Sequence, residues 1–199
     1  MNFLKWLAAG SCAVLMTACS VPVPFGSPED RVRIQQDLGL EQPPSMSVLI
    51  PLKWTLFDYG VEQKVPPAAD TVALVQPGVL TLIGYENGHY TREAEFPSAS
   101  VDCLYIFKGP SSAQPLWLLK SGRPVLFHIG DGRGFVITAL REKLIDRMAA
   151  AGFQIHSDAQ GKAYEPTGVS NTRLVYASVY GGHTESVAEE RYYNVCAKK

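Results

Sequence analysis

The sequence lacks an excess of charge of either sign. Its 199 residues include 18 Lys and Arg against 19 Asp and Glu, so the formal net charge is -1. Nucleic-acid binding needs clustered Lys and Arg, and this balance offers no such footprint, so we expect no nucleic-acid partner. The hydrophobic content of 46% is too high for a disordered chain. The length fits one domain of ordinary size.

The familiar catalytic and cofactor motifs are also missing, among them G-x-S-x-G, S-x-x-K and H-E-x-x-H. The nearest candidate is the glycine-rich run Gly130–Gly134, because alternating glycines before a helix can hold phosphate through backbone N–H groups. Its spacing matches neither the dinucleotide fingerprint nor the P-loop. A tight turn at Asp131-Gly132 explains the same glycines. We therefore expect no cofactor.

Histidine occurs only four times and never at metal-site spacing, so we predict no metal site. His183 is the strongest candidate for chemistry. It lies in the run Gly181–Glu185, for which we predict a loop, and loops carry function more often than cores do. Glu185 follows within two positions, and Glu189 and Glu190 lie further along. One hypothesis is therefore a cell-wall or envelope hydrolase that uses His183 with nearby carboxylates.

The first twenty residues have the layout of a secretory signal peptide. Lys5 supplies a positive charge, residues 6–16 are nearly all apolar, and the small residues Thr17 and Ala18 precede Cys19. The apolar run is too short to form a permanent membrane-spanning helix. Residues 1–18 are therefore predicted to be removed, which would leave 181 of the 199 residues.

The run Leu15–Cys19 resembles the lipobox of bacterial lipoproteins, with Met16 at the place where leucine is usual. The resemblance implies that the Cys19 thiol receives a diacylglycerol, that the signal peptide is cut before Cys19, and that the new amino group is acylated. Two or more acyl chains give stable membrane anchoring. Ser20 stands where an Asp would retain enteric-type lipoproteins at the inner membrane. The resemblance therefore implies an outer-membrane anchor with the domain facing the periplasm. The alternative is an ordinary signal peptide with a cysteine there by chance.

Cysteine use follows from this processing. Cys12 would leave with the signal peptide and Cys19 would be acylated, so only Cys103 and Cys196 would remain as thiols. In an oxidising periplasm two cysteines most simply form one disulfide. The alternatives are two buried free thiols or a pair of metal ligands, although no further ligand stands at zinc-site spacing from either cysteine.

Downstream of the anchor, the chain predicts a tether and then one domain. We expect residues 19–45 to form the acylated N-terminus and tether, and residues 46–199 to form a single periplasmic domain. Ser27 as N-cap and Gly39 as C-terminal stop predict a short helix over residues 28–38 within the tether. This helix can dock on the domain or on a partner.

Branched and aromatic runs predict that most of the domain is β structure. Asn87-Gly88 between two such runs is the strongest short hairpin signal a sequence can carry. Alternation in the second arm of this hairpin predicts that Tyr90, Arg92, Ala94 and Phe96 share one face. The expected strands cover residues 48–57, 71–76, 79–86, 89–96, 101–107, 116–120, 125–129, 153–156, 172–180 and 191–196.

One longer helix is predicted, because Leu140, Leu144 and Met148 recur at helical spacing. Thr138 is its expected cap, and Gly152 its expected stop.

The predicted fold class is α+β, a mainly antiparallel sheet with one principal helix at about residues 139–151 packed on it. We expect the last strand, over residues 191–196, to pair beside the strand at 101–107. That pairing would bring Cys196 to Cys103.

The favoured interpretation is a lipid-anchored interaction or structural module rather than an enzyme. Its partners would be the membrane and subunits of an envelope assembly: a secretion, conjugation or pilus apparatus, or an outer-membrane biogenesis machine. Residues 136–155 look like small periplasmic secretin-type or pilus-type modules. Residues 116–119 form either a buried strand or an exposed docking edge. Tyrosines near the C-terminus suit sheet packing and protein contact; they are Tyr176, Tyr180, Tyr192 and Tyr193.

Two observations would separate these interpretations. A cleft that gathers His183, Glu185 and another polar group would favour the hydrolase. An uncovered sheet edge or a groove with exposed tyrosines would favour the interaction module.

Overall fold

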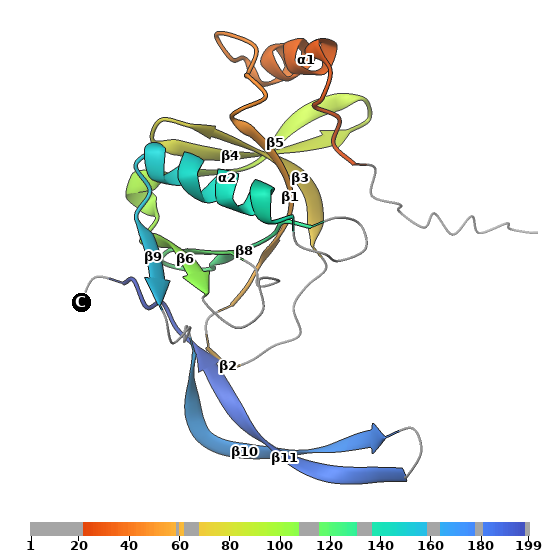
Figure 1. Ribbon diagram of the computed structural model, residues 1–199, viewed down its shortest axis with the longest axis vertical. Helices are drawn as coiled ribbons and strands as arrows, with labels where there is room; N and C mark the ends of the chain where they lie inside the picture. Colours follow the sequence, from red (N-terminus) through yellow and green to blue (C-terminus); the bar gives the residue numbers. More distant parts are fainter. Residues whose placement is uncertain are drawn as a thin grey trace, which may run out of the picture.

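The computed structural model describes residues 22–58, 60–61, 68–107, 116–130, 137–158, 164–177 and 181–197. The expected signal peptide, Cys19, the run 131–134 and Tyr180 lie outside these residues. The described chain has an α+β fold with a large, mainly antiparallel sheet and two α-helices (Figure 1). The elements are, in order, α1 (Pro28–Leu38), β1 (Leu49–Leu56), β2 (Gly60–Val61), β3 (Ala69–Gln76), β4 (Val79–Glu86), β5 (His89–Pro97), the 3-10 helix η1 (Ser98–Ser100), β6 (Cys103–Phe107), β7 (Leu116–Leu119), β8 (Val125–His128), α2 (Thr138–Ala150), β9 (Ile155–Asp158), β10 (Tyr164–Ala177) and β11 (Gly181–Tyr192).

The large sheet has eight strands in the order β5-β4-β3-β1-β8-β7-β6-β9. Every neighbouring pair is antiparallel except β6 and β9, which run parallel. Parallel strands need a long crossover connection, and α2 lies in the crossover that leads into β9. The prediction that residues 191–196 pair beside residues 101–107 is therefore wrong, because β7 and β9 already flank β6.

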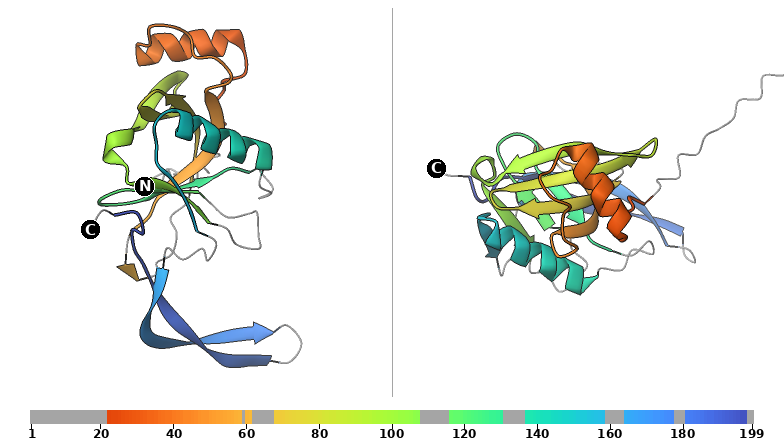
Figure 2. Two further views of the ribbon diagram at one scale, coloured as in Figure 1. Left: turned by 60° about the vertical axis from the view of Figure 1, so that its left-hand side comes forward. Right: turned by 90° about the horizontal axis from the view of Figure 1, so that it is seen from above.

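Helix α2 lies against the concave side of the bent sheet (Figure 2). Leu144 and Met148 are fully buried there, in the main core with apolar residues from seven of the eight strands. The N-cap is Ile137, and no side chain caps the helix, so the prediction of Thr138 as cap is wrong: Thr138 is the first helical residue. The Lys143 ammonium donates to the carbonyl oxygens of Met46 and Leu49, 2.9 and 3.2 Å away, and so links α2 to the start of β1.

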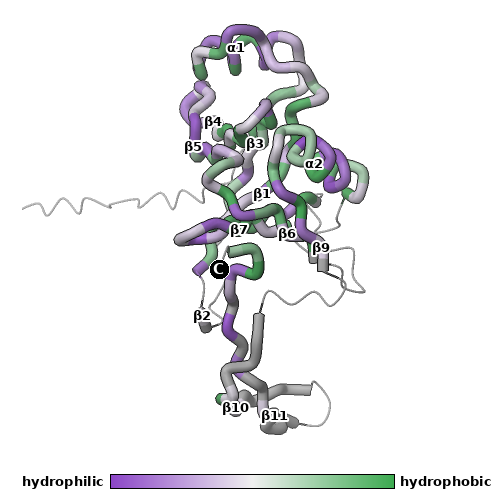
Figure 3. The backbone as a smooth tube through the Cα atoms, turned by 90° about the vertical axis from the view of Figure 1, so that its left-hand side faces the viewer, coloured by the Kyte–Doolittle hydropathy of each residue, from purple (hydrophilic) through white to green (hydrophobic). Residues whose placement is uncertain are grey.

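The predicted helix over residues 28–38 is confirmed as α1, with the caps that the sequence indicates. The Ser27 hydroxyl accepts the Asp30 backbone N–H and the Asp30 carboxylate accepts the Ser27 N–H, both at 3.0 Å, and Gly39 takes the left-handed conformation at φ 64°. Ile34 and Leu38 are buried against the convex side of the sheet. The other residues of α1 are mostly hydrophilic (Figure 3). The helix therefore docks on the domain.

Because α1 and α2 cover opposite faces, the middle strands are buried on both sides. In β3, Val72 and Leu74 pack in the α1 cluster, whereas Ala73 and Val75 pack in the main core. Strands that are buried on both faces have nearly continuous apolar sequences. This is the pattern that the sequence shows over residues 71–76.

The hairpin at Asn87-Gly88 is confirmed, with both residues at positive φ (52° and 86°). A β-bulge at Glu93 changes the facing of β5, since Leu82 pairs with residue 94 but Ile83 pairs with residue 92. Tyr90 consequently packs in the α1 cluster and Phe96 in the main core. The prediction that residues 90, 92, 94 and 96 share one face is therefore wrong.

The bulge also directs the Glu93 carboxylate across the sheet. It accepts the Trp54 indole N–H at 2.7 Å. The same side chain lies over Gly84, where a Cβ atom would stand 2.3 Å from Glu93 Oε1. A larger residue at this position would therefore require the Glu93 side chain to shift from its place beside Trp54.

The expected disulfide is present between Cys103 and Cys196, with the Cα atoms 6.0 Å apart. Cys103 is nearly fully buried in a third apolar cluster with Tyr105 and Leu119, on which Trp117 and Val195 pack. Residues 193–196 reach this cluster after the end of β11, so Cys196 does not lie in a strand.

Strands β10 and β11 form a long antiparallel hairpin that extends away from the large sheet (Figure 1). We call residues 164–192 the arm. At its base the short strand β2 pairs with Arg191 and Tyr192, which completes a separate sheet in the order β10-β11-β2. Of the strands predicted at 172–180 and 191–196, residues 172–177 lie in β10 and residues 191–192 end β11, whereas residues 193–196 are not in a strand.

Candidate interaction surface

His183 lies in β11, not in the predicted loop: residues 181–185 are the first residues of that strand and pair with residues 173–177 of β10. His183 opposes Val175, and Glu185 opposes Arg173. His183 and Glu185 stand two positions apart in this strand. The prediction of a loop at residues 181–185 is therefore wrong.

The other candidate carboxylates are separated from His183 by the extended backbone. Glu189 follows His183 by six positions along β11. At about 3.3 Å per residue, the two Cα atoms lie roughly 20 Å apart. Among the described residues, no group of three or more His, Cys, Asp and Glu side chains is placed to hold a metal ion.

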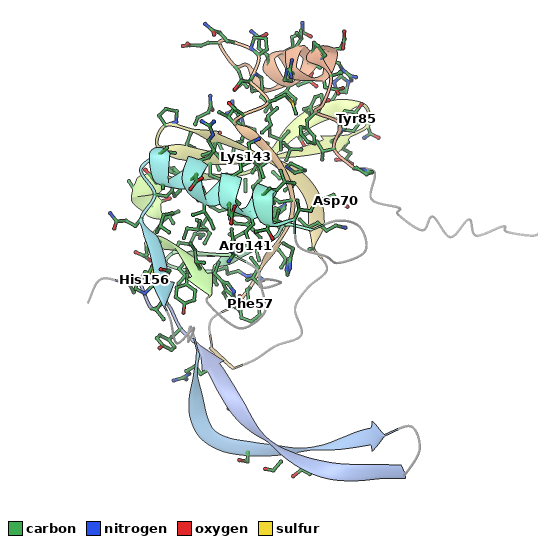
Figure 4. All side chains as sticks on the ribbon, in the orientation of Figure 1. Phe57, Asp70, Tyr85, Arg141, Lys143 and His156 are labelled. Atoms are coloured by element: carbon green, nitrogen blue, oxygen red, sulfur yellow. A yellow bond between two sulfur atoms is a disulfide. The ribbon has the colours of Figure 1, made fainter. Side chains whose placement is uncertain are left out.

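The four histidines occupy four different strands. His89 in β5 lies 3.5 Å from the Asp37 carboxylate at the end of α1. His128 in β8 is half-buried, and this burial lowers the pKa of its imidazole. His156 in β9 stacks on the Tyr105 ring, with centroids 5.7 Å apart (Figure 4).

An open groove of about 670 Å³ lies beside the disulfide, between η1 and the start of β9. Asp102, Gln154 and His156 are among its polar lining residues. The Asp102 carboxylate accepts the Asn194 amide at 2.7 Å, and the His156 ring is stacked on Tyr105. The Asp102–Asn194 contact therefore holds the C-terminal segment to the body beside this groove, whereas the His156–Tyr105 contact joins two strands of the large sheet.

The base of the arm is held to the body at two points. Strand β2 pairs with Arg191 and Tyr192 just before β11 ends. Four residues after Tyr192, Cys196 is bonded to Cys103 in β6. The Asn194 side chain lies between these points, accepting the Cys196 N–H at 3.0 Å. These contacts fix where the arm leaves the body.

Beyond its base, the arm adjoins no further strand in the part of the chain that the structure describes. Strand β10 is the edge strand of the small sheet, and no described strand pairs with its outer side over residues 164–177. The outer side of β11 is paired by β2 only at residues 191 and 192, and no other described strand adjoins it. Unpaired strand edges present N–H and C=O groups that can add a further strand.

Sequence reasoning underestimated the arm because Pro166 and Gly168 interrupt the β pattern. The ladder shifts register between Pro166 and Ser170, and Gly168 adopts φ 82°. Such a bulge lets a ribbon continue through residues that ordinarily end a strand.

Residues 116–119 form a buried strand rather than an exposed docking edge. Leu116, Leu118 and Leu119 are buried, and β7 is an interior strand between β6 and β8. Trp117 is half-buried and meets the Phe57 ring edge-on, with centroids 5.3 Å apart.

No helix in the described part of the chain is both long and apolar enough to cross a membrane.

No family model matches the chain, and no curated protein sequence matches it. Among solved structures, it is similar to an activated truncation of Vav1 without ligand, with a TM-score of 0.42 and 14% identity over 62% of this chain and 33% of that one. Vav1 bound by an allosteric inhibitor and autoinhibited Vav1 match at TM-scores of 0.40 and 0.39, each with 14% identity over 75% of this chain. The chain spans 28% and 29% of those two structures.

Proposed function

We propose that the protein is a lipid-anchored interaction module of the bacterial cell envelope, and that the arm is the element that binds its partner. The observation that carries this proposal is the arm itself, a long hairpin that pairs with no described strand beyond its base, where it is held to a packed domain.

The proposed cellular location rests on the N-terminal sequence. Residues 15–19 resemble a lipobox, which implies acylation of Cys19, and Ser20 favours the outer membrane with the domain in the periplasm. The Cys103–Cys196 disulfide agrees with that compartment, because disulfides persist in oxidising environments such as the periplasm.

The arm supports a binding role for a physical reason. A two-stranded hairpin alone is at best marginally stable in water, since it has little apolar surface to bury. Pairing with a further strand would satisfy its outer N–H and C=O groups. A rigid base lowers the entropy lost when such a partner binds. An envelope assembly, such as a secretion, conjugation or pilus apparatus or an outer-membrane biogenesis machine, would supply the partner.

Site-specific photo-crosslinking in the native host tests the proposal. A photoreactive residue replaces Ser186, an exposed position in β11, and in a control it replaces Ser121, an exposed position in the turn between β7 and β8. In a separate variant, Asn-Gly replaces residues 170–188, which shortens the arm beyond the Pro166–Glu190 pair.

We expect a discrete adduct with an envelope protein from position 186 and none from position 121. The shortened variant, still folded and membrane-bound, should lose that partner in affinity capture from membranes. Retention of the same partners by the shortened variant would contradict the role of the arm. A cleaved, acylated and membrane-bound Cys19→Ala variant would contradict the lipoprotein assignment.

A further inference from the structure

The chain immediately after the expected anchor is held on the folded domain. Val23 is only 7% exposed and packs in the α1 cluster. The next residue, Pro24, accepts the Tyr90 hydroxyl through its carbonyl oxygen at 2.8 Å. Residues 23 and 24 are therefore part of the body.

Helix α1 is bound to the same hairpin by polar contacts along its length. The Tyr90 backbone N–H donates to the Asp37 carboxylate at 2.8 Å, and the Arg92 guanidinium donates to the Leu38 carbonyl at 2.6 Å. The Arg33 guanidinium donates to the Gly88 carbonyl and lies over the Tyr90 ring, 5.8 Å from its centroid. The point at which the chain joins the body is thus rigid with respect to the sheet.

Covalent geometry limits how far the body can stand from the anchor. Cys19 precedes Val23 by four positions. Whatever conformation they adopt, four residues span at most about 14 Å. Acyl chains on Cys19 would therefore hold the surface of the bilayer within about that distance of Val23.

We infer that the α1 end of the molecule, meaning α1 and the β4–β5 turn, rests on the phospholipid headgroups while the arm points away from the membrane. Figures 1 and 2 place α1 and the arm at opposite ends of the long axis. This orientation rests on the proposed acylation of Cys19. It would present the open edges of the arm to partners at a distance from the bilayer.

The α1 end is not a basic, membrane-attracting surface. Its acidic residues outnumber its basic ones, and anionic lipids attract clusters of Lys and Arg. The acidic residues are Glu29, Asp30, Asp37 and Glu86, against Arg31 and Arg33. The one large apolar side chain exposed on α1 is Val32, at 40%. The short tether, not charge, therefore sets the orientation, and added anionic lipid should not strengthen the contact.

Fluorescence quenching on vesicles tests this orientation with the full acylated protein. A single cysteine replaces Val32 on α1 or, as a matched control, Ser186 on the arm, and carries a fluorophore; both positions are exposed. The protein is inserted into phosphatidylethanolamine vesicles that contain lipids with a nitroxide on the headgroup, a quencher that acts only at close range. A further variant of Val32→Cys carries a Gly-Ser linker of roughly 12 residues after Ser20, with an r.m.s. length of about 19 Å.

We expect quenching at position 32, none at position 186, partial recovery of fluorescence with the linker, and no change when phosphatidylglycerol is added. Equal quenching at both positions, or quenching at position 186 alone, in protein that floats with the vesicles overturns the orientation and leaves the proposed function standing. Protein that does not float overturns the acylation and the orientation together.

Discussion

Loss of the Cys103–Cys196 bond is expected to lower the stability of the domain sharply. The bond joins residues 93 positions apart, so the loop that it closes includes β7, β8, α2, β9 and the arm. Cys196→Ala is the cleaner substitution, because Cys196 is half-buried whereas Cys103 is only 2% exposed within its cluster.

The expected magnitude follows from the entropy of the unfolded chain. For a loop of 93 residues, the loop-closure relation yields about 4.6 kcal/mol at 25 °C. In a domain of this size each kcal/mol shifts the melting temperature by about 2–4 °C, so the expected decrease is on the order of 9–18 °C.

The assay is urea denaturation of the chain from residue 20 onward, secreted behind a signal peptide that is not acylated. The oxidised protein is compared with the same protein under reducing conditions and with Cys196→Ala, all followed by tryptophan fluorescence. Titration of free thiols in denaturant checks the oxidised sample, in which we expect none.

A loss of less than about 1 kcal/mol in both reduced protein and Cys196→Ala would refute the loop-entropy reasoning, since a long loop should carry most of the stabilisation. Two reactive thiols in the oxidised sample would contradict the bond itself. A large loss on reduction with no loss in Cys196→Ala would also contradict the reasoning, because the bond is absent from both proteins and they contain no other disulfide.

Three further perturbations probe the packing of the sheet and of α1. Gly84→Ala should destabilise the fold by about 1–3 kcal/mol in urea denaturation, because the new Cβ meets Glu93, whereas Gly26→Ala, which meets nothing within 4 Å, should be near neutral. Tyr90→Phe should cost about 1 kcal/mol and loosen α1 in hydrogen exchange. Burial raises the pKa of Tyr90 from 10.0 to about 12, so wild-type stability should fall as the pH rises through that range, and Tyr90→Phe should lack this part of the fall. The N–H that Tyr90 donates lowers the pKa of Asp37 below 3.8, so wild-type stability should decrease as the pH drops below that value, and Asp37→Asn should show a smaller decrease. If the stability of Tyr90→Phe and Asp37→Asn varied with pH in parallel with that of wild type, these two pKa assignments would be contradicted.

Local chemistry was enough to predict several elements from the amino-acid order alone. The caps at Ser27 and Gly39 define α1 because they satisfy backbone groups within the same few residues. Asn87-Gly88 defines its hairpin because both residues accept positive φ. The pairing of Cys103 with Cys196 followed from the count of cysteines left after the expected processing.

Tertiary structure decided which of these elements meet. The sequence left open whether α1 docks on the domain, and the hairpin residue Tyr90 holds it there. The bulge at Glu93 places the side chains before and after it on opposite faces of the sheet, which a prediction from strict alternation cannot anticipate. The parallel strand β9 took the place beside β6 that residues 191–196 were expected to occupy, and this freed β11 to form the arm. Caps and turns are satisfied within a few residues, whereas strand neighbours are chosen by contacts between distant segments. The order of amino acids therefore determined the individual helices and turns and the predicted cellular location. Pairing between distant strands determined that β10 and β11 form the arm.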